Sequence, residues 1–409
     1  MSSGFPLPEI GDILHEKYQV TRRIGAGSFG AIFEVQSLEN GKLYAAKLEN
    51  PKISTPQLNK EYKLYVLLDA APGIPRVYDY WTQDEFRGMI MERLGYSLGH
   101  RFHECGKILS MKTVLMCAIQ MLCRLEYLHQ RSFIHRDIKP DNFVFGVGNN
   151  SNLLYMIDLG LANKYRDLHT FIHINYTEDK GLAGTARYVS INVHLGVEQS
   201  CRDDLESVGY VLISLVKGKL PWQGLEVASK NEKYELLSQA KMDTPLDTLC
   251  QGLPTEFLNY MTRVRNLRFD ERPAYTQLRG LFIGLMVKLN FAFDFEYDWV
   301  INKTQRLNDA LRGASDQADL IIKTSPNELK GAAKARSGKQ NGFWQPLPFF
   351  AMMNEAAKFV GMSRKGLEAA EKEDSKKVAL PKEQKMFLLD PRETQIPKMP
   401  VQIEFEPGN

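Results

Sequence analysis

His135–Asn142 reads His-Arg-Asp-Ile-Lys-Pro-Asp-Asn, and Asp158-Leu159-Gly160 follows one short hairpin later. The first stretch carries a proton acceptor, Asp137, and an amide, Asn142, and the second adds the carboxylate of Asp158. Such a set suits transfer of a phosphoryl group held by Mg²⁺ onto a hydroxyl, because positioning and charge neutralisation dominate that reaction. We therefore expect the two stretches to form one catalytic site.

The overall composition is that of an ordinary globular protein. The 409 residues are 44% hydrophobic and 25% charged, which leaves room for about two or three domains. The net charge of +3 is too small to indicate nucleic acid as a direct partner. The five cysteines contain no Cys-x-x-Cys pair and indicate a reducing compartment. Met1–Ile10 lacks the features of a secretory signal, and no stretch approaches the ~20 apolar residues of a membrane span, so we expect a soluble, intracellular protein.

Residues 18–94 show mostly the period-two pattern of strands. The turn pair Asn40-Gly41 lies between two of them. Gln57–Leu68 has apolar residues on one face and is predicted to be a helix. The predicted strands are Tyr18–Thr21, Ala31–Val35, Leu43–Leu48, Val77–Trp81 and Gly88–Met91.

The periodicity of the following residues is helical. Ser110 is a good N-cap for Met111–Gln130, which is apolar nearly all round and is therefore predicted to be buried. Further helices are predicted at Asp204–Val216, Glu256–Arg265 and Tyr275–Leu289, and a short strand at Leu153–Ile157. The sequence thus predicts an α+β fold of two lobes, a small β-rich lobe over 18–94 and a larger helical lobe over 95–300, preceded by an N-terminal extension over 1–17.

The character of the chain changes after Trp299, and residues 301–409 are predicted to form a separate, partly disordered C-terminal tail. Lys303–Asn341 is polar and has no aromatic residues, so it cannot build a core. Phe343–Phe350 is a cluster of aromatic residues and prolines, and Met352–Glu373 is a candidate amphipathic helix. Two alternatives stay open for the tail: it docks on the chain's own helical lobe, or it binds partner proteins.

Gly25-Ala26-Gly27-Ser28-Phe29-Gly30 fits either a dinucleotide-binding turn or a flap over phosphates. The first alternative requires a helix after the glycines, whereas Ala31–Val35 alternates as a strand. The chain also has no Gly-x-x-x-x-Gly-Lys-Ser/Thr motif, which excludes a P-loop of that kind. A flap over the phosphates of a nucleotide is therefore favoured.

A cation for the phosphates is supplied by Lys47, one strand after the glycines. Glu61, on the predicted helix, is the carboxylate placed to pair with it. Met91 and the residues that follow should form the hinge, where the backbone of Glu92 and Leu94 can bind adenine. We assign the ATP site to Ile24, Gly25, Gly27, Ser28, Gly30, Ile32, Ala45, Lys47, Met91, Glu92 and Leu94.

Each polar residue of the catalytic loop has an expected role. Asp137 would accept the proton of the substrate hydroxyl, and Lys139 would steady the γ-phosphate. Asn142 and Asp158 would hold Mg²⁺ ions. Asp204, at the start of a predicted helix, is expected to hydrogen-bond to the backbone of the catalytic loop.

The segment after Asp158 carries motifs of another kind. Gly184–Asn192 reads Gly-Thr-Ala-Arg-Tyr-Val-Ser-Ile-Asn, where most protein kinases have Ala-Pro-Glu, and Arg202–Ser207 reads Arg-Asp-Asp-Leu-Glu-Ser. Together with Lys139–Phe143 these motifs closely resemble the casein kinase I family, over about residues 18–300. The resemblance implies a bilobal protein-kinase fold and a monomeric Ser/Thr protein kinase. It also implies the use of ATP and Mg²⁺ and a preference for acidic or already phosphorylated protein substrates.

The resemblance further implies two anion sites for such substrates. Arg187 and Lys233, with the Gly224 backbone beside them, match the family's basic pocket and can hold a phosphate through charge-assisted hydrogen bonds. Arg136 and Lys180 match a second anion site near the activation segment.

Four departures from the family pattern stand out. Asn163 replaces a lysine of the second anion site and should weaken it. Leu159 replaces the more common Phe and keeps a hydrophobic plug, and Gly99 and His100 replace acidic residues at the mouth of the cleft. The basic nuclear-targeting stretch is diluted in Ser229–Lys233, so a cytoplasmic location is expected and a nuclear one is left open.

Two rival classes of protein are disfavoured by the sequence. A pseudokinase scaffold is disfavoured because every catalytic position is filled. A tau-tubulin or vaccinia-related kinase is disfavoured by Glu206, where the tubulin branch tends to have Trp, and by the intact Ser190-Ile191-Asn192.

Overall fold

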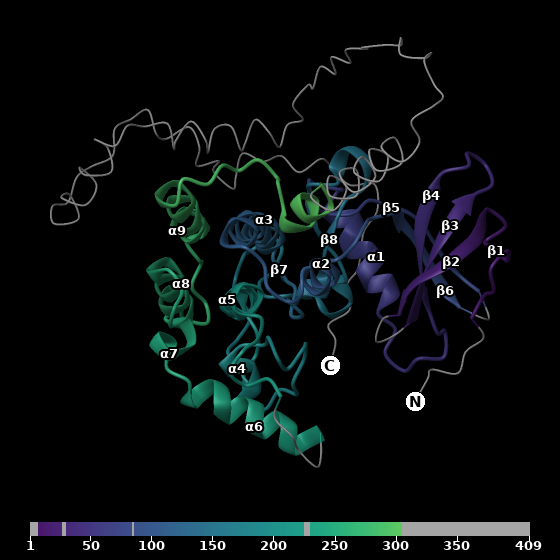
Figure 1. Ribbon diagram of the computed structural model, residues 1–409. Helices are drawn as coiled ribbons and strands as arrows, with labels where there is room; N and C mark the ends of the chain where they lie inside the picture. The colour runs from purple at the N-terminus through teal and green to yellow at the C-terminus, as the bar shows by residue number, and fades with distance from the viewer. Residues whose placement is uncertain (1–6, 27–29, 84–85, 225–229, 305–409) are drawn as a thin grey trace, which may run out of the picture. The chain divides into compact units, whose positions relative to one another are not determined.

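The computed structural model describes residues 7–26, 30–83, 86–224 and 230–304. Its elements all belong to Met1–Leu329, the first of two units into which the chain divides. In Figure 1 the strands of the N-terminal part, in purple, lie to one side of the helices of the C-terminal part, in teal and green. The predicted α+β fold with a curled β-sheet lobe and a helical lobe is confirmed.

The N-terminal lobe is built on one antiparallel sheet of six strands among the described residues. These are β1 (Ile13–Leu14), β2 (Tyr18–Ala26), β3 (Gly30–Ser37), β4 (Leu43–Glu49), β5 (Val77–Thr82) and β6 (Arg87–Glu92). Their order is β1-β2-β3-β4-β6-β5, so the sheet begins inside the predicted extension over 1–17. Gly41, at φ +67°, lies in the predicted turn between β3 and β4, where its N–H donates to Ser37 O at 2.9 Å.

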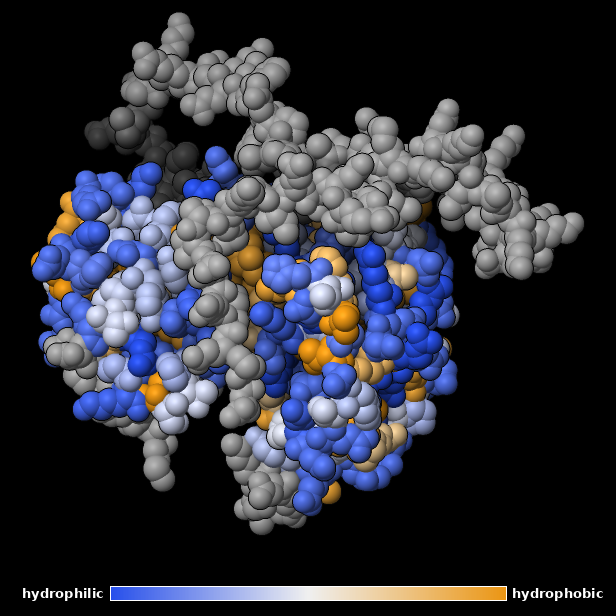
Figure 2. Space-filling view, turned by 180° about the vertical axis from the view of Figure 1, so that it is seen from behind, coloured by the Kyte–Doolittle hydropathy of each residue, from blue (hydrophilic) through white to orange (hydrophobic). Residues whose placement is uncertain are grey.

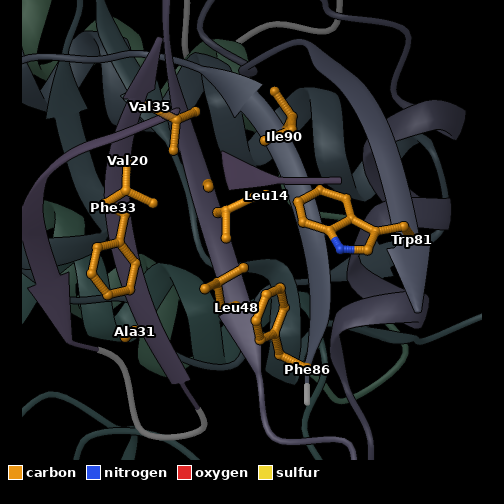
Figure 3. Close-up of a cluster of buried hydrophobic side chains, with 10 residues drawn as sticks. Leu14, Val20, Ala31, Phe33, Val35, Leu48, Trp81, Phe86 and Ile90 are labelled. Atoms are coloured by element: carbon orange, nitrogen blue, oxygen red, sulfur yellow. The ribbon is translucent and has the colours of Figure 1, made fainter. Parts of the chain in front are cut away.

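Buried apolar side chains from neighbouring strands form the core of this lobe. Figure 3 shows Leu14 from β1 and Trp81 from β5 reaching into the same cluster. The rings of Trp81 and Phe86 meet edge to face with centroids 6.5 Å apart. The cluster consists of Leu14, Val20, Ala31, Phe33, Val35, Ala46, Leu48, Trp81, Phe86 and Ile90. Removal of this apolar surface from water stabilises the sheet that carries Lys47.

Helix α1 (Leu58–Leu67) follows β4 and lies within one residue of the predicted Gln57–Leu68. Its buried side chains include Leu58, Leu64 and Tyr65, together with Glu61. An ionised carboxylate is costly to bury without a partner, so we expect a cation near Glu61.

The C-terminal lobe is helical. Helix α3 (Met111–Gln130) has the predicted bounds, and the Ser110 hydroxyl accepts the Thr113 N–H at its start. Most of its side chains are buried, as predicted, and it packs against two later helices, α5 and α9 (Figure 1). The helices are α2 (Leu98–Glu104), α4 (Ile191–His194), α5 (Cys201–Lys217), α6 (Lys230–Asp243), α7 (Leu246–Cys250), α8 (Thr255–Arg265) and α9 (Tyr275–Lys288).

A short hairpin connects the loop His135–Asn142 to Asp158. Strand β8 (Phe143–Phe145) pairs antiparallel with β9 (Leu154–Met156), the core of the strand predicted before Asp158. The pairing continues beyond the strands, because the Ile157 N–H donates to Asn142 O at 2.9 Å. Asn142 and Asp158 are therefore neighbours in space.

Aromatic residues near the end of the described chain complete the helical lobe. Tyr297 and Trp299 stack with centroids 4.7 Å apart, and both meet Phe145 edge to face. Asp298 accepts the backbone N–H of Ser110 at 2.6 Å and its hydroxyl at 2.5 Å. The end of the described chain thus covers the N-terminus of α3.

The face of the described part seen in Figure 2 is mostly hydrophilic, and hydrophobic residues form small patches between the hydrophilic ones. None of the helices that the structure describes is long and apolar enough to cross a membrane. Residues 305–409 lie outside the described ranges, so the Phe343–Phe350 cluster and the Met352–Glu373 helix stay predictions.

Candidate active site

Lys47 lies between two carboxylates from different parts of the chain. Its Nζ is 2.6 Å from Glu61 Oε2 and 2.7 Å from Asp158 Oδ1. Burial by itself would lower the pKa of Lys47, but the negative charges of Glu61 and Asp158 outweigh it and raise this pKa. The Lys47 ammonium in turn lowers the pKa of Asp158. One cation therefore joins β4, α1 and the residues after β9.

The backbone of Asp158 has the left-handed conformation, φ 62° and ψ 65°, which residues with side chains adopt rarely. Two contacts with α1 stabilise it. The Asp158 N–H donates to Tyr65 Oη at 3.0 Å, and the Leu159 N–H donates to Glu61 Oε1 at 3.2 Å. Leu159 is buried, as expected for a hydrophobic plug. Such strained backbone conformations are often found at functional sites. Here the strained residue, Asp158, is also the residue that contacts Lys47.

Asp204, in the first turn of α5, holds the catalytic loop. Its Oδ2 accepts the His135 N–H at 2.7 Å, and its Oδ1 accepts the Arg136 N–H at 2.9 Å. Arg136 has φ +69°, so the loop turns at this residue. The His135 ring is buried behind the loop, with Nε2 3.0 Å from Ile157 O. These contacts place Asp204 beneath the loop, as its predicted supporting role requires.

Three side chains surround the Asp137 carboxylate. Lys139 Nζ lies 2.5 Å from Oδ2, and Asn142 Nδ2 donates to Oδ2 at 3.1 Å. Thr185 Oγ1 donates to Oδ1 at 2.7 Å. Thr185 was not predicted as a site residue, and the signal that could have found it is its place inside the Gly184–Asn192 motif. Both oxygens of Asp137 are thus oriented by hydrogen bonds.

Residues assigned to the ATP site lie on four adjacent strands. Gly25 pairs with Ile32 across β2 and β3, and Ala45 pairs with Met91 across β4 and β6. A Cβ on Gly30 would lie 1.7 Å from a carbonyl oxygen of β4, so a side chain does not fit there. The start of β3 can therefore approach β4, the strand that carries Lys47, closely at Gly30.

The remaining ATP-site residues are described in part. Ile24 is 42% exposed at the end of β2, and Leu94 follows β6. The Glu92 N–H donates to Arg76 O at 2.7 Å, so this N–H is not free for a nucleotide. Gly27 and Ser28 lie outside the described residues.

Asn142 and Asp158 offer oxygen ligands to a divalent cation. Asn142 uses its Nδ2 to hold Asp137, which leaves the amide oxygen for a cation. Asp158 remains 40% exposed beside its bond to Lys47. Within the described ranges there is no group of three or more His, Cys, Asp or Glu residues that could hold a metal ion. Mg²⁺ commonly takes only one or two protein ligands and adds phosphate oxygens, so this pair fits the ion.

The first predicted anion site has Arg187 at its centre. The Arg187 side chain is exposed, whereas its carbonyl accepts the Trp222 Nε1–H at 2.9 Å. The Trp222–Gly224 turn therefore lies beside Arg187, and the space around Gly224 is open. Lys233 belongs to α6, but its side chain lies outside what the structure describes.

The second predicted anion site is less favourable. Lys180 is half exposed, and its Nζ pairs with Glu198 at 3.2 Å. Gly184 packs so closely on Arg136 that a Cβ would lie 2.3 Å from the Arg136 carbonyl oxygen. An anion at Lys180 would compete with Glu198. The site also has Asn163 at the position where the resemblance to casein kinase I predicts a lysine.

The sequence matches the family described as protein kinase domain over residues 18–280. The chain belongs to this family. ATP, a divalent metal ion and phosphoryl transfer to protein substrates are general properties of protein kinase domains. At this level the predictions of fold, reaction and nucleotide are confirmed.

Proposed function

We propose that this protein is an ATP- and Mg²⁺-dependent Ser/Thr protein kinase of casein kinase I type that phosphorylates acidic or already phosphorylated proteins. The observation that carries the proposal is the orientation of Asp137 by Lys139, Asn142 and Thr185. These contacts hold the proton acceptor Asp137 beside the cation of Lys139. They also hold it beside the Gly184–Asn192 segment, on which a protein substrate would lie.

The proposed chemistry assigns one task to each group. Asp137 accepts the proton of the attacking hydroxyl, and Lys139 neutralises charge on the transferred phosphoryl group. Lys47 binds the nucleotide phosphates and is held by its ion pair with Glu61. Asn142 and Asp158 would hold Mg²⁺, which neutralises phosphate charge when bound.

Thr185 supports the preference for Ser and Thr. Its hydrogen bond ties the Gly184–Asn192 segment directly to Asp137. A substrate lying on that segment has its backbone close to the Asp137 carboxylate. A short distance between the substrate backbone and the Asp137 carboxylate suits the short side chains of Ser and Thr better than the long side chain of Tyr.

The two motifs behind the resemblance to casein kinase I contact each other, which supports the assignment to this type. Ser190 Oγ donates to Asp203 Oδ1 at 2.5 Å, and the Ile191 N–H donates to Glu206 Oε1 at 3.1 Å. The Ser-Ile-Asn sequence and the Asp-Asp-Leu-Glu sequence thus act as one unit that replaces the usual Ala-Pro-Glu.

The experiment uses the full chain with ATP and Mg²⁺ and four peptides of equal length. One carries a phosphoserine three residues before the target Ser, one an Asp there and one a Lys, and the last has Tyr as its target. The expected order of kcat/KM is phosphoserine, then Asp, then Lys, with the Tyr peptide inactive. A preference for Lys or Tyr would refute the proposed type, and no turnover by wild type would favour the pseudokinase alternative.

A further inference from the structure

Lys241, in the last turn of α6, is a fully buried lysine that the proposed chemistry does not use. Its Nζ donates to Val189 O at 2.6 Å and to Ala186 O at 2.9 Å. The third partner is His194 Nε2, at 3.1 Å. The same His194 nitrogen lies 3.2 Å from Ala186 O, so the two carbonyl groups accept from Lys241 whichever tautomer His194 adopts.

The acceptors belong to the segment that a protein substrate would contact. Trp222 donates a hydrogen bond to the carbonyl oxygen of Arg187, and Lys241 donates to those of Ala186 and Val189. The carbonyl groups of these three residues therefore point into the lobe. The Arg187 side chain is exposed, and Thr185, just before this stretch, contacts Asp137.

The environment of Lys241 makes this arrangement costly to maintain. Its Nζ lies 5.2 Å from the ring centroid of Tyr210 and 5.4 Å from that of Trp222. Burial lowers its pKa to about 7. Among the described residues it forms no ion pair with a carboxylate, so carbonyl groups, His194 and aromatic faces solvate the amine. An apolar side chain would fill this space without the desolvation cost, which argues that the donors themselves matter.

We infer that Lys241 is a positioning residue for protein substrates, because it fixes the backbone on which Arg187 and Thr185 are carried. It acts from inside the lobe and does not touch the substrate. The inference rests on the proposed function, since it concerns the segment that would bind the phosphorylated or acidic peptide.

The test compares Lys241→Met with wild type in the full chain. Methionine keeps most of the volume and removes all three donors. The KM for the phosphoserine peptide should rise about tenfold or more, because the hydrogen bonds that hold the carbonyl groups of Ala186 and Val189 are lost. The KM for ATP should stay within about twofold, because the nucleotide site lies on other elements.

Lys217→Met is the matched control. Lys217 donates to a single carbonyl, Leu249 O, at 2.8 Å elsewhere in the same lobe. It should lower stability without changing the peptide KM. An equal rise of the peptide KM in both variants, or an equal rise of peptide and ATP KM in Lys241→Met, would overturn the inference.

Hydrogen exchange of Lys241→Gln gives a readout that needs no catalysis. The N–H groups of Tyr188 and Val189 both donate to Thr185 O, so their exchange reports on this turn. They should exchange faster in the variant while the amides of α3 are unchanged. Unchanged exchange at Tyr188 and Val189 contradicts the inference even if Lys241→Met does not fold. If wild type phosphorylated no peptide, the proposed function would fail, and hydrogen exchange would still decide the role of Lys241.

Discussion

Asp137 is the residue on which the proposed reaction depends most directly. Replacement by Asn keeps the shape and one hydrogen-bond acceptor but removes the group that takes up a proton. General-base catalysis contributes about 10²–10⁴ in rate, so Asp137→Asn should lower kcat by that factor. The KM for ATP should change little, because Lys47 and its two partners are untouched. Steady-state kinetics on casein measure both constants, and activity above a few per cent of wild type would disprove the assignment.

Arg187 is the residue that we propose binds a phosphate on the protein substrate. A phosphate carries about −1.5 to −2 charges and three acceptor oxygens, whereas Asp carries one charge. Arg187→Ala, alone or with Lys233→Ala, should therefore lower kcat/KM roughly tenfold or more on a phosphoserine peptide and less on an acidic peptide.

The control for this comparison is Arg268→Ala, which removes an arginine whose side chain is 78% exposed on the same lobe. It should leave both peptides unaffected. If Arg187→Ala reduced the two peptides equally, Arg187 would be a structural residue of the segment and not a phosphate ligand.

At the scale of elements, one carboxylate joins the flap strands to the hinge. Glu34 on β3 accepts Arg22 Nε at 2.9 Å from β2, and it also pairs with Arg93 in the hinge. The hydrogen bond from Arg22 lowers the pKa of Glu34 from 4.5 to about 2. This contribution to stability is therefore complete above pH 4.5 and is lost as the pH falls toward 2.

Glu34→Gln should lower the free energy of unfolding at neutral pH by on the order of 1 kcal/mol, because Arg22 is largely exposed. The difference from wild type should shrink between pH 4.5 and about 2, where the wild-type carboxylate becomes protonated. Urea unfolding at several pH values measures this, with Glu39→Gln as a control on an exposed glutamate. A difference independent of pH would show that Glu34 acts through its shape.

Elements with strong periodicity could be predicted, and weakly patterned ones could not. Helix α3 is apolar nearly all round and begins at a good N-cap, so its bounds followed from the sequence. Helix α6 is polar over most of its length and buries Lys241 as well as Leu237, and a buried lysine is not revealed by a hydrophobic pattern. Helices α2 and α7 are short, and β1 has two residues, so tertiary contacts decide their conformation.

The site shows the same distinction between contiguous and distant residues. Asp137, Lys139 and Asn142 share one loop, so their proximity could be predicted from a motif. The bond from Thr185 to Asp137 and the contact of Lys47 with Asp158 join segments far apart in the chain. Such contacts depend on packing of the whole domain, which the local pattern of the sequence does not specify.

At the scale of the whole molecule, the end of the kinase domain can be tested by truncation. Asp298 binds Ser110 at the start of α3, and Trp299 packs on Phe145. A chain ending at Thr304 should therefore stay soluble, monomeric and active. A chain ending at Phe293 loses these contacts and should show a clearly lower melting temperature. Gel filtration, thermal unfolding and peptide kinetics measure the outcome, and insolubility of the longer variant would show that the tail completes the domain.

The β8–β9 hairpin has a practical consequence for labelling the enzyme. Its strands hold Asn142 and Asp158 at one end, and its exposed turn, with Gly148 at φ +57° in open space, lies at the other. Since the paired strands set the spacing of the two ligands, extra residues in the turn need not alter it. A short epitope or a fluorophore-binding peptide inserted after Gly148 would thus place a reporter one hairpin away from the proposed metal ligands, and we expect the kinase to stay active.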